Sequence, residues 1–313
     1  MVELLSALLI IAGLALFESI TSFDNAVINA EILRKMSPWA RRWFLTWGLL
    51  IAVFLLRGIL PLIIVFLTNP SLGIMGTINA TFSGDPHVAE QIEQSAPVLL
   101  MMGGVFMIFL FFHWLFLEPK NFGLSHEKAF ARHGVWFFAV VSIILAAITW
   151  YSLQIEPMMA FGAVVGSTLF FIIHGFRENA EQKEKEMLQG SSKMSDWSKI
   201  FYLEAIDASF SIDGVIGAFA FTLWVPLILI GNGIGALIVR EMTIRNVENV
   251  KKYKYLKNGA MYAILVLGIV MVADAFGANV PFWLSPLATI GIIAYFLWRS
   301  VQELTSPSPK PVL

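Results

Sequence analysis

The sequence predicts an all-α polytopic membrane protein with about nine transmembrane helices. This prediction rests largely on composition, because 58% of the residues are hydrophobic and only 14% are charged, whereas soluble domains contain about 25% charged residues. The apolar residues also gather in runs that are long enough to cross a bilayer. The net charge of −1 gives no reason to expect a nucleic-acid partner. The absence of cysteine excludes disulfides, thiolate metal ligands and thiol catalysis.

A bilayer span requires about 20 mostly apolar residues. By this criterion the candidate spans, in chain order, are 4–32, 44–67, 97–117, 134–154, 157–175, 199–222, 224–240, 259–276 and 282–300. We expect the first run to be retained as a span, because it lacks the basic n-region of a cleaved secretory signal.

Basic residues predict the orientation of the spans, because short cytoplasmic loops retain Lys and Arg. They follow the first, third, fifth, seventh and last spans: Arg34, Lys35, Arg41 and Arg42; Lys120, Lys128 and Arg132; Arg177, Lys183, Lys185, Lys193 and Lys199; Arg240, Arg245, Lys251, Lys252, Lys254 and Lys257; Arg299 and Lys310. The alternate loops contain no Lys or Arg. The pattern predicts a multi-pass protein of the cytoplasmic membrane with its N-terminus outside and its C-terminus in the cytoplasm.

A polar stretch at 178–197 has the composition of a solvated linker and divides the chain into two halves. We expect four parts: a first repeat of three helices at 1–117, linking helices with the linker at 118–198, a second repeat at 199–276, and a final helix with the tail at 277–313.

The repeats are predicted from two similar segments, "ESITSFDNAVINA" and "DASFSIDGVIGAFA", which align Glu18 with Asp207, Asp24 with Asp213 and Asn25 with Gly214. The predicted spans that carry these segments run in opposite directions. Inverted repeats whose polar helices meet at the midplane are the architecture of secondary transporters.

Helical spacing places the polar side chains of each segment in a stripe. The first stripe contains Glu18, Ser22, Asn25 and Asn29, and the second contains Glu204, Asp207, Ser211 and Gly214. Asp24 and Asp213 each lie about 100° to the side of their stripe. Local unwinding of the helix would bring them next to the stripe, and Gly214 and Gly217 would make such unwinding easier. Two stripes that face each other would form an oxygen-rich site.

The chemistry of these side chains limits the kinds of ligand that such a site can bind. A carboxylate at the bilayer centre costs at least about 2.5 kcal/mol, so several together indicate that they bind a cation or take up protons. Oxygen ligands without cysteine favour hard ions such as Mn²⁺, Mg²⁺ or Ca²⁺. We therefore expect a transported divalent cation, protons as its counter-ion, and no tightly bound cofactor.

The two acidic segments resemble the motifs of the TerC family of membrane proteins. "FESITSFDN" is similar to the first family motif and "DASFSID" to the second, while "LLRGIL" around Arg57 and "YLKNGA" at 255–260 resemble positions that follow them. The resemblance implies a fold of the LysE superfamily and manganese export, and it makes Glu18, Asp24, Asn25, Asp207 and Asp213 the metal-site candidates. Gly214 stands where the family often has Ser, which indicates a divergent subgroup.

Other polar residues have supporting parts in this prediction. Ser22, Asn29, Glu204 and Ser211 are additional polar candidates, and Arg57 is the expected charge partner of one acid. The alternative is that the carboxylates bond to helix backbones or to Arg57 and only hold the bundle together.

Three function classes remain open from the sequence. The favoured class is an exporter of a divalent cation, Mn²⁺ above Mg²⁺ and Ca²⁺. The second is an exporter of an amino acid or another organic solute, which requires a fixed cation for the substrate carboxylate. The third is a membrane factor that transports nothing and assists secretion or metal loading. We expect no enzymatic activity, and the expected partners are membrane lipid, the metal ion and protons.

Overall fold

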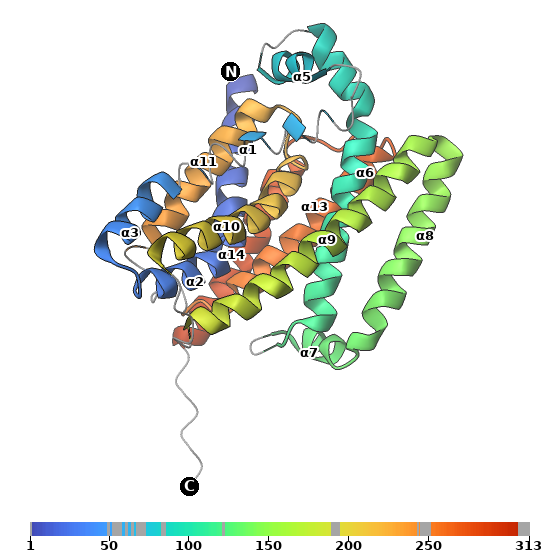
Figure 1. Cartoon of the computed structure of the whole chain (residues 1–313). Coiled ribbons are helices and arrows are strands. Elements are labelled where there is room, and N and C mark those ends of the chain that lie inside the picture. The colour runs from blue at the N-terminus through green and yellow to red at the C-terminus, as the bar shows by residue number, and fades with distance from the viewer. Residues whose placement is uncertain are drawn as a thin grey trace.

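The chain folds as a bundle of helices, shown by a computed structural model in Figure 1. The structure describes residues 2–48, 51, 58–59, 62–63, 66, 73–82, 86–120, 123–188, 195–242, 244 and 252–305. No strand occurs among the described residues. The predicted all-α class is therefore confirmed.

The first half of the chain contains two long helices with shorter ones between them. Its elements are α1 (Val2–Thr21), α2 (Phe23–Leu33), α3 (Pro38–Trp43), the π-helical turn η1 (Phe44–Gly48), α5 (Gly73–Phe82) and α6 (Pro86–Leu117). The remaining elements are α7 (Ser125–Ala131), η4 (Gly134–Trp136), α8 (Phe137–Ile155), α9 (Pro157–Leu188), α10 (Asp196–Ala218), α11 (Val225–Glu241), α13 (Leu256–Ala275) and α14 (Leu284–Thr305).

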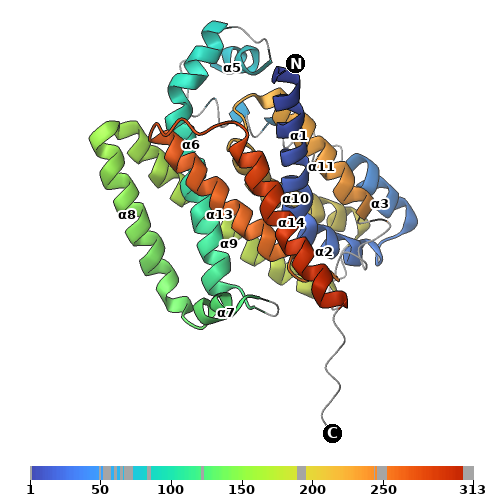
Figure 2. The same cartoon turned by 180° about the vertical axis from the view of Figure 1, so that it is seen from behind.

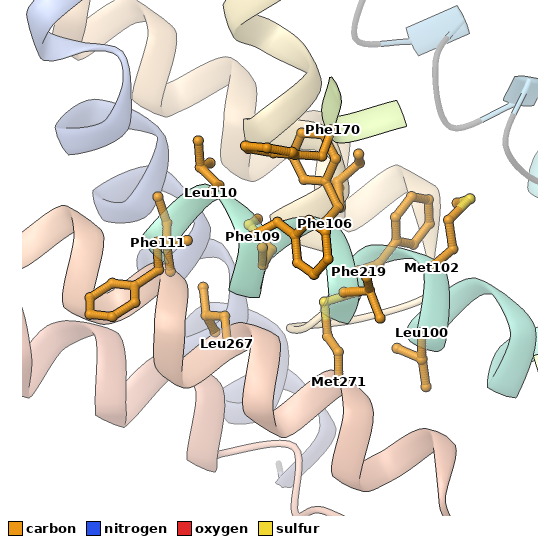
Figure 3. Packing of buried hydrophobic residues seen from close by; sticks show 14 of the residues in the cluster. Leu100, Met102, Phe106, Phe109, Leu110, Phe111, Phe170, Phe219, Leu267 and Met271 are labelled. Atoms are coloured by element: carbon orange, nitrogen blue, oxygen red, sulfur yellow. The ribbon is translucent and has the colours of Figure 1, made fainter. Parts of the chain in front are cut away.

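Helix α6 is the centre of the apolar core and packs along both α9 and α13. Figure 3 shows its side chains Met102, Phe106 and Phe109 among Phe170 of α9 and Met271 of α13. The close approach of α6 and α9 depends on glycine, because a Cβ on Gly166 would lie 2.1 Å from the carbonyl oxygen of Met102. Small residues allow such backbone contact between membrane helices.

The first helices of the two halves lie side by side and run antiparallel. Near the start of this contact, a Cβ on Gly13 of α1 would lie 2.9 Å from the Phe221 ring, just beyond α10. At its other end, Asn29 of α2 donates a hydrogen bond to Asp207 of α10. Beyond them, Leu33 of α2 packs in a buried cluster with Leu203 of α10. Residue numbers therefore rise along α1 and α2 while they fall along α10.

Six described helices are long and apolar enough to cross a membrane: Glu3–Thr21, Ala96–Leu117, Gly134–Ile155, Pro157–Asn179, Leu256–Ala275 and Leu284–Thr305. Nine spans were predicted, and the other three do not qualify among the described residues. Helix α10 carries several charged residues, α11 has 17 residues, and most of 44–67 lies outside the described residues.

The arrangement of these helices suits a membrane. Figures 1 and 2 both show the start of α1 and the end of α14 at opposite ends of the bundle, with α8 at its outer edge. Large apolar side chains on α8, such as Phe138, Ile143 and Trp150, are exposed. An exposed apolar helix of this length is expected to contact lipid.

Part of the stretch predicted as a solvated linker is helical. Helix α9 continues past the predicted span end at 175 to Leu188, so the polar residues up to that point are helical. The reason is that Glu, Lys and Gln, which dominate this stretch, are good helix formers that extend a helix beyond its apolar part.

Candidate functional site

The first carboxylate of the predicted site, Glu18, is buried where α1, α10 and α11 meet, with 1% of its surface exposed. The hydroxyl of Ser22 donates a hydrogen bond to it. Glycines of both neighbouring helices make room for it: a Cβ on Gly214 of α10 would lie 2.5 Å from Oε2 of Glu18, and one on Gly235 of α11 would lie 2.6 Å from its Cβ. The glycines thus position an acidic side chain in the bundle interior.

Asp213, on α10, forms a buried ion pair. Its Oδ2 lies 2.5 Å from Nη2 of Arg177 of α9, and both side chains are 11% exposed. Glu18 is close enough to Asp213 for the two negative charges to repel each other. One guanidinium and two carboxylates therefore share the junction of α1, α9 and α10, and their formal charges leave an excess of one negative charge.

A second polar group lies further towards the start of α10. Asn29 of α2 donates from Nδ2 to Oδ1 of Asp207 at 2.8 Å. Glu204 lies one turn before Asp207 on α10, and the two carboxylates are close enough to repel each other. A Cβ on Gly48, at the end of η1, would lie 2.0 Å from Oε1 of Glu204. Glycine again makes room for a carboxylate.

The acids of α10 stand at two levels because the helix is continuous from Asp196 to Ala218. Asp213 lies six positions after Asp207, which corresponds to about 9 Å along the helix at 1.5 Å per residue. Unwinding at Gly214 and Gly217, which the sequence suggested, does not occur. Gly217 instead allows close packing, since its Cβ would lie 2.6 Å from the Phe17 ring.

Several predicted site residues lie outside what the structure describes. Arg57 is not among the described residues, and the side chains of Asp24 and Asn25 are not described. Among the side chains that are described, no group of three or more His, Cys, Asp or Glu could hold a metal ion. The shared ion between Asp24 and Asp213 therefore stays a prediction.

Two residues of this region were not singled out from the sequence. Arg177 was assigned to a cytoplasmic loop, yet it lies inside α9 and is 9% exposed. The available signal was its position directly after the apolar run that ends at Phe176. Asn232 of α11 is buried, and neither of its amide atoms hydrogen bonds to a described residue. Its signal was a lone amide within the apolar "LILIGNGIGALIV".

Comparisons with known proteins identify relatives by sequence. A family model described as "Protein of unknown function (DUF475)" matches residues 23–306. The "Uncharacterized membrane protein YceF" of Bacillus subtilis (strain 168) is 29% identical over 121 residues, which are 36% of this chain. The match covers 47% of that relative, so the chain matches about half of its length. No solved structure matches the chain significantly.

These findings overturn the resemblance to the TerC family. That resemblance rested on two short acidic motifs and a few residues after each, whereas the DUF475 match extends over most of the chain. Short runs of acidic and hydroxyl residues meet a general need of polar membrane helices, so they are weaker evidence of descent than a match of this length. The LysE-superfamily fold and the manganese export that were inferred from the motifs lose that support.

Proposed function

The chain belongs to the DUF475 family, and from this premise we propose that it is a membrane transporter of hard divalent cations that uses the carboxylates of Glu18 and Asp213. It is a membrane protein with several apolar helices and a relative named as a membrane protein. The proposal places it in the cytoplasmic membrane with its N-terminus outside, as the distribution of basic residues predicts.

The ion pair between Arg177 and Asp213 is the observation that supports this function best. It is a cation held between buried helices by a carboxylate, at 2.5 Å, with a second carboxylate close by. Removing charges from water costs several kcal/mol per ion, so a pair serving packing alone would be at a disadvantage against apolar residues. An entering cation can take the place of Arg177 beside Asp213.

The ligand atoms favour a hard ion. Carboxylate and hydroxyl oxygens of Glu18, Asp213 and Ser22 suit Mg²⁺, Ca²⁺ and Mn²⁺ better than softer metals. Mn²⁺ is the ion to examine first, because its paramagnetism makes binding measurable without a label. Protons are the proposed counter-ion, since carboxylates within a membrane bind cations or take up protons.

Transport by purified protein tests the proposal. The full chain is reconstituted into liposomes that contain a metal-quenched dye, and Mn²⁺ influx is followed with a proton gradient in either direction. Asp213→Asn keeps the side-chain shape but removes the charge, so it should abolish influx. The matched control is Asp274→Asn, because Asp274 lies near the end of α13 and accepts a hydrogen bond from Val280 N in the following loop. Equal influx by the Asp213→Asn variant and the parent would refute the proposal.

An organic-solute transporter is the second candidate, and Arg177 is the observation that favours it. This class requires a fixed cation for a substrate carboxylate, and the Arg177 guanidinium is such a cation. The flux of radiolabelled amino acids, measured in the same liposomes, distinguishes an organic-solute transporter from a cation transporter. Amino-acid flux that Arg177→Gln abolishes, without Mn²⁺ flux, would favour the solute. No flux of either kind would favour a membrane factor that transports nothing.

A further inference from the structure

The polar group around Asp207 contains buried ligand atoms that have no hydrogen bond with a described residue. Asn29 is 6% exposed, and its Nδ2 is bonded to Asp207, yet its Oδ1 accepts no hydrogen bond from a described residue. Because Oδ1 and Nδ2 belong to one small amide, this free oxygen lies next to the Asp207 carboxylate. A buried acceptor without a donor is destabilising, so binding to a cation would stabilise it.

Glu204 shows the same feature more strongly. Both of its carboxylate oxygens are buried, and neither hydrogen bonds to a described residue. The carboxylate lies against Gly48, where any side chain would displace it. Gly48 lies in a π-helical turn, and such turns are frequent at functional sites.

A hydroxyl lies between this group and the Glu18–Asp213 site. Ser211 is on α10, one turn after Asp207 and about half a turn before Asp213. It is 2% exposed, and its Oγ has no hydrogen-bond partner among the described residues. A cation that moves along α10 from Asp207 to Asp213 would pass this oxygen.

We propose that Glu204, Asp207 and the Oδ1 of Asn29 form a second cation-binding site, separate from the Glu18–Asp213 site and linked to it past Ser211. Two carboxylates and an amide oxygen are ligands of a hard divalent cation. In contrast to Asp213, Glu204 has no ion pair with a described basic residue. An incoming cation therefore displaces no described guanidinium from Glu204. This inference rests on the proposed function.

The number of bound ions tests the inference. The purified full chain in detergent is titrated with Mn²⁺, and free Mn²⁺ is measured by electron paramagnetic resonance. The parent should bind two ions, and Glu204→Gln should bind one. Asp213→Asn should also bind one, which would be the ion held by Glu204 and Asp207. The control is Glu303→Gln, which removes an exposed carboxylate paired with Lys254 and should leave two ions.

Failure of the second site and failure of the proposed function give different results. If the parent binds one ion that Asp213→Asn removes and Glu204→Gln retains, the second site is refuted and the proposed function stands. If the parent binds no ion, both are refuted. Should Glu204→Gln not fold, Asn29→Ala replaces it in the test. Removal of its oxygen should weaken one of the two ions at least tenfold, and unchanged affinity for both ions would refute the second site.

Discussion

Replacing Arg177 with Gln tests the ion pair that supports the proposed function. The change removes the positive charge next to Asp213 and leaves that carboxylate buried, with 11% of its side chain exposed. Breaking a buried pair from one side costs about 3–5 kcal/mol. Because both partners keep some exposure, we expect the lower end, about 3 kcal/mol of unfolding free energy.

Cation binding should reverse much of this loss. In Arg177→Gln the carboxylate no longer has a guanidinium to displace, so the variant should bind Mn²⁺ more tightly than the parent does. At a free Mn²⁺ concentration of 100 times the Kd, binding adds about 2.7 kcal/mol of stability. The added stability should therefore appear at lower Mn²⁺ concentrations in Arg177→Gln than in the parent. The double variant Arg177→Gln/Asp213→Asn should be more stable than Arg177→Gln alone and should lose the stabilisation that comes from the ion at Asp213.

Denaturant unfolding of the purified chain in detergent, with and without Mn²⁺, provides the measurement. The matched control is Lys257→Gln, whose partner Glu118 lies 2.7 Å away with side chains 39% and 32% exposed. Exposed pairs contribute about 0–1 kcal/mol, so this control should change little. The reasoning is refuted if Arg177→Gln unfolds like the control and responds to Mn²⁺ as the parent does.

Two further predictions concern packing and pH. Gly166→Ala should destabilise the fold by about 1–3 kcal/mol, because its Cβ would lie 2.1 Å from the Met102 carbonyl oxygen. A Cβ on Gly175 of the same helix meets nothing within 4 Å, so Gly175→Ala should stabilise the fold by up to about 1 kcal/mol. Thermal unfolding of the two variants and the parent provides the comparison. Burial lowers the pKa of Lys120, whose ammonium lies over the Trp114 ring, to about 8 from 10.5. The unfolded chain then binds more protons between pH 8 and 10.5, so stability should rise with pH in this window; urea titrations should show a smaller rise for Lys120→Gln, and an equal rise would contradict the prediction.

The helical class and most of the apolar spans could be predicted from the sequence, because a run of about 20 apolar residues has few alternatives to a membrane helix. The predicted runs at 97–117, 134–154 and 259–276 lie within or close to qualifying helices of the structure. The number of spans was harder to predict. Helix α10 places its acids inside the bundle, where burial depends on contacts with α1 and α2 that no property of α10 alone reveals.

The candidate site was only partly accessible to sequence reasoning. The acids could be selected, because Glu18, Asp207 and Asp213 interrupt apolar surroundings. The partners of these acids could not be identified from the sequence, since Arg177 and Asp213 are brought together by the packing of α9 on α10. The rule that basic residues lie in cytoplasmic loops also predicted a loop position for Arg177. Glu18 itself lies before the start of the family match at Phe23, so its burial beside Gly214 is evidence that only the structure provides.

Asp213 and Glu204, at the two acidic levels of α10, differ in their described ion pairs, and this difference gives an order of events if both proposals hold. Asp213 is paired with a guanidinium carried by α9, so a cation reaches Asp213 only if Arg177 withdraws, which requires α9 or its side chain to move relative to α10. At the other level, Glu204 has no ion pair with a described basic residue, and the amide of Asn29 can keep its hydrogen bond to Asp207 while its oxygen binds the ion. The ion would therefore enter at Glu204 and Asp207 first and advance past Ser211 when Arg177 leaves. The movement of the ion to Asp213 would then depend on a rearrangement between α9 and α10. Alternating access requires that ion movement be coupled to helix movement in this way.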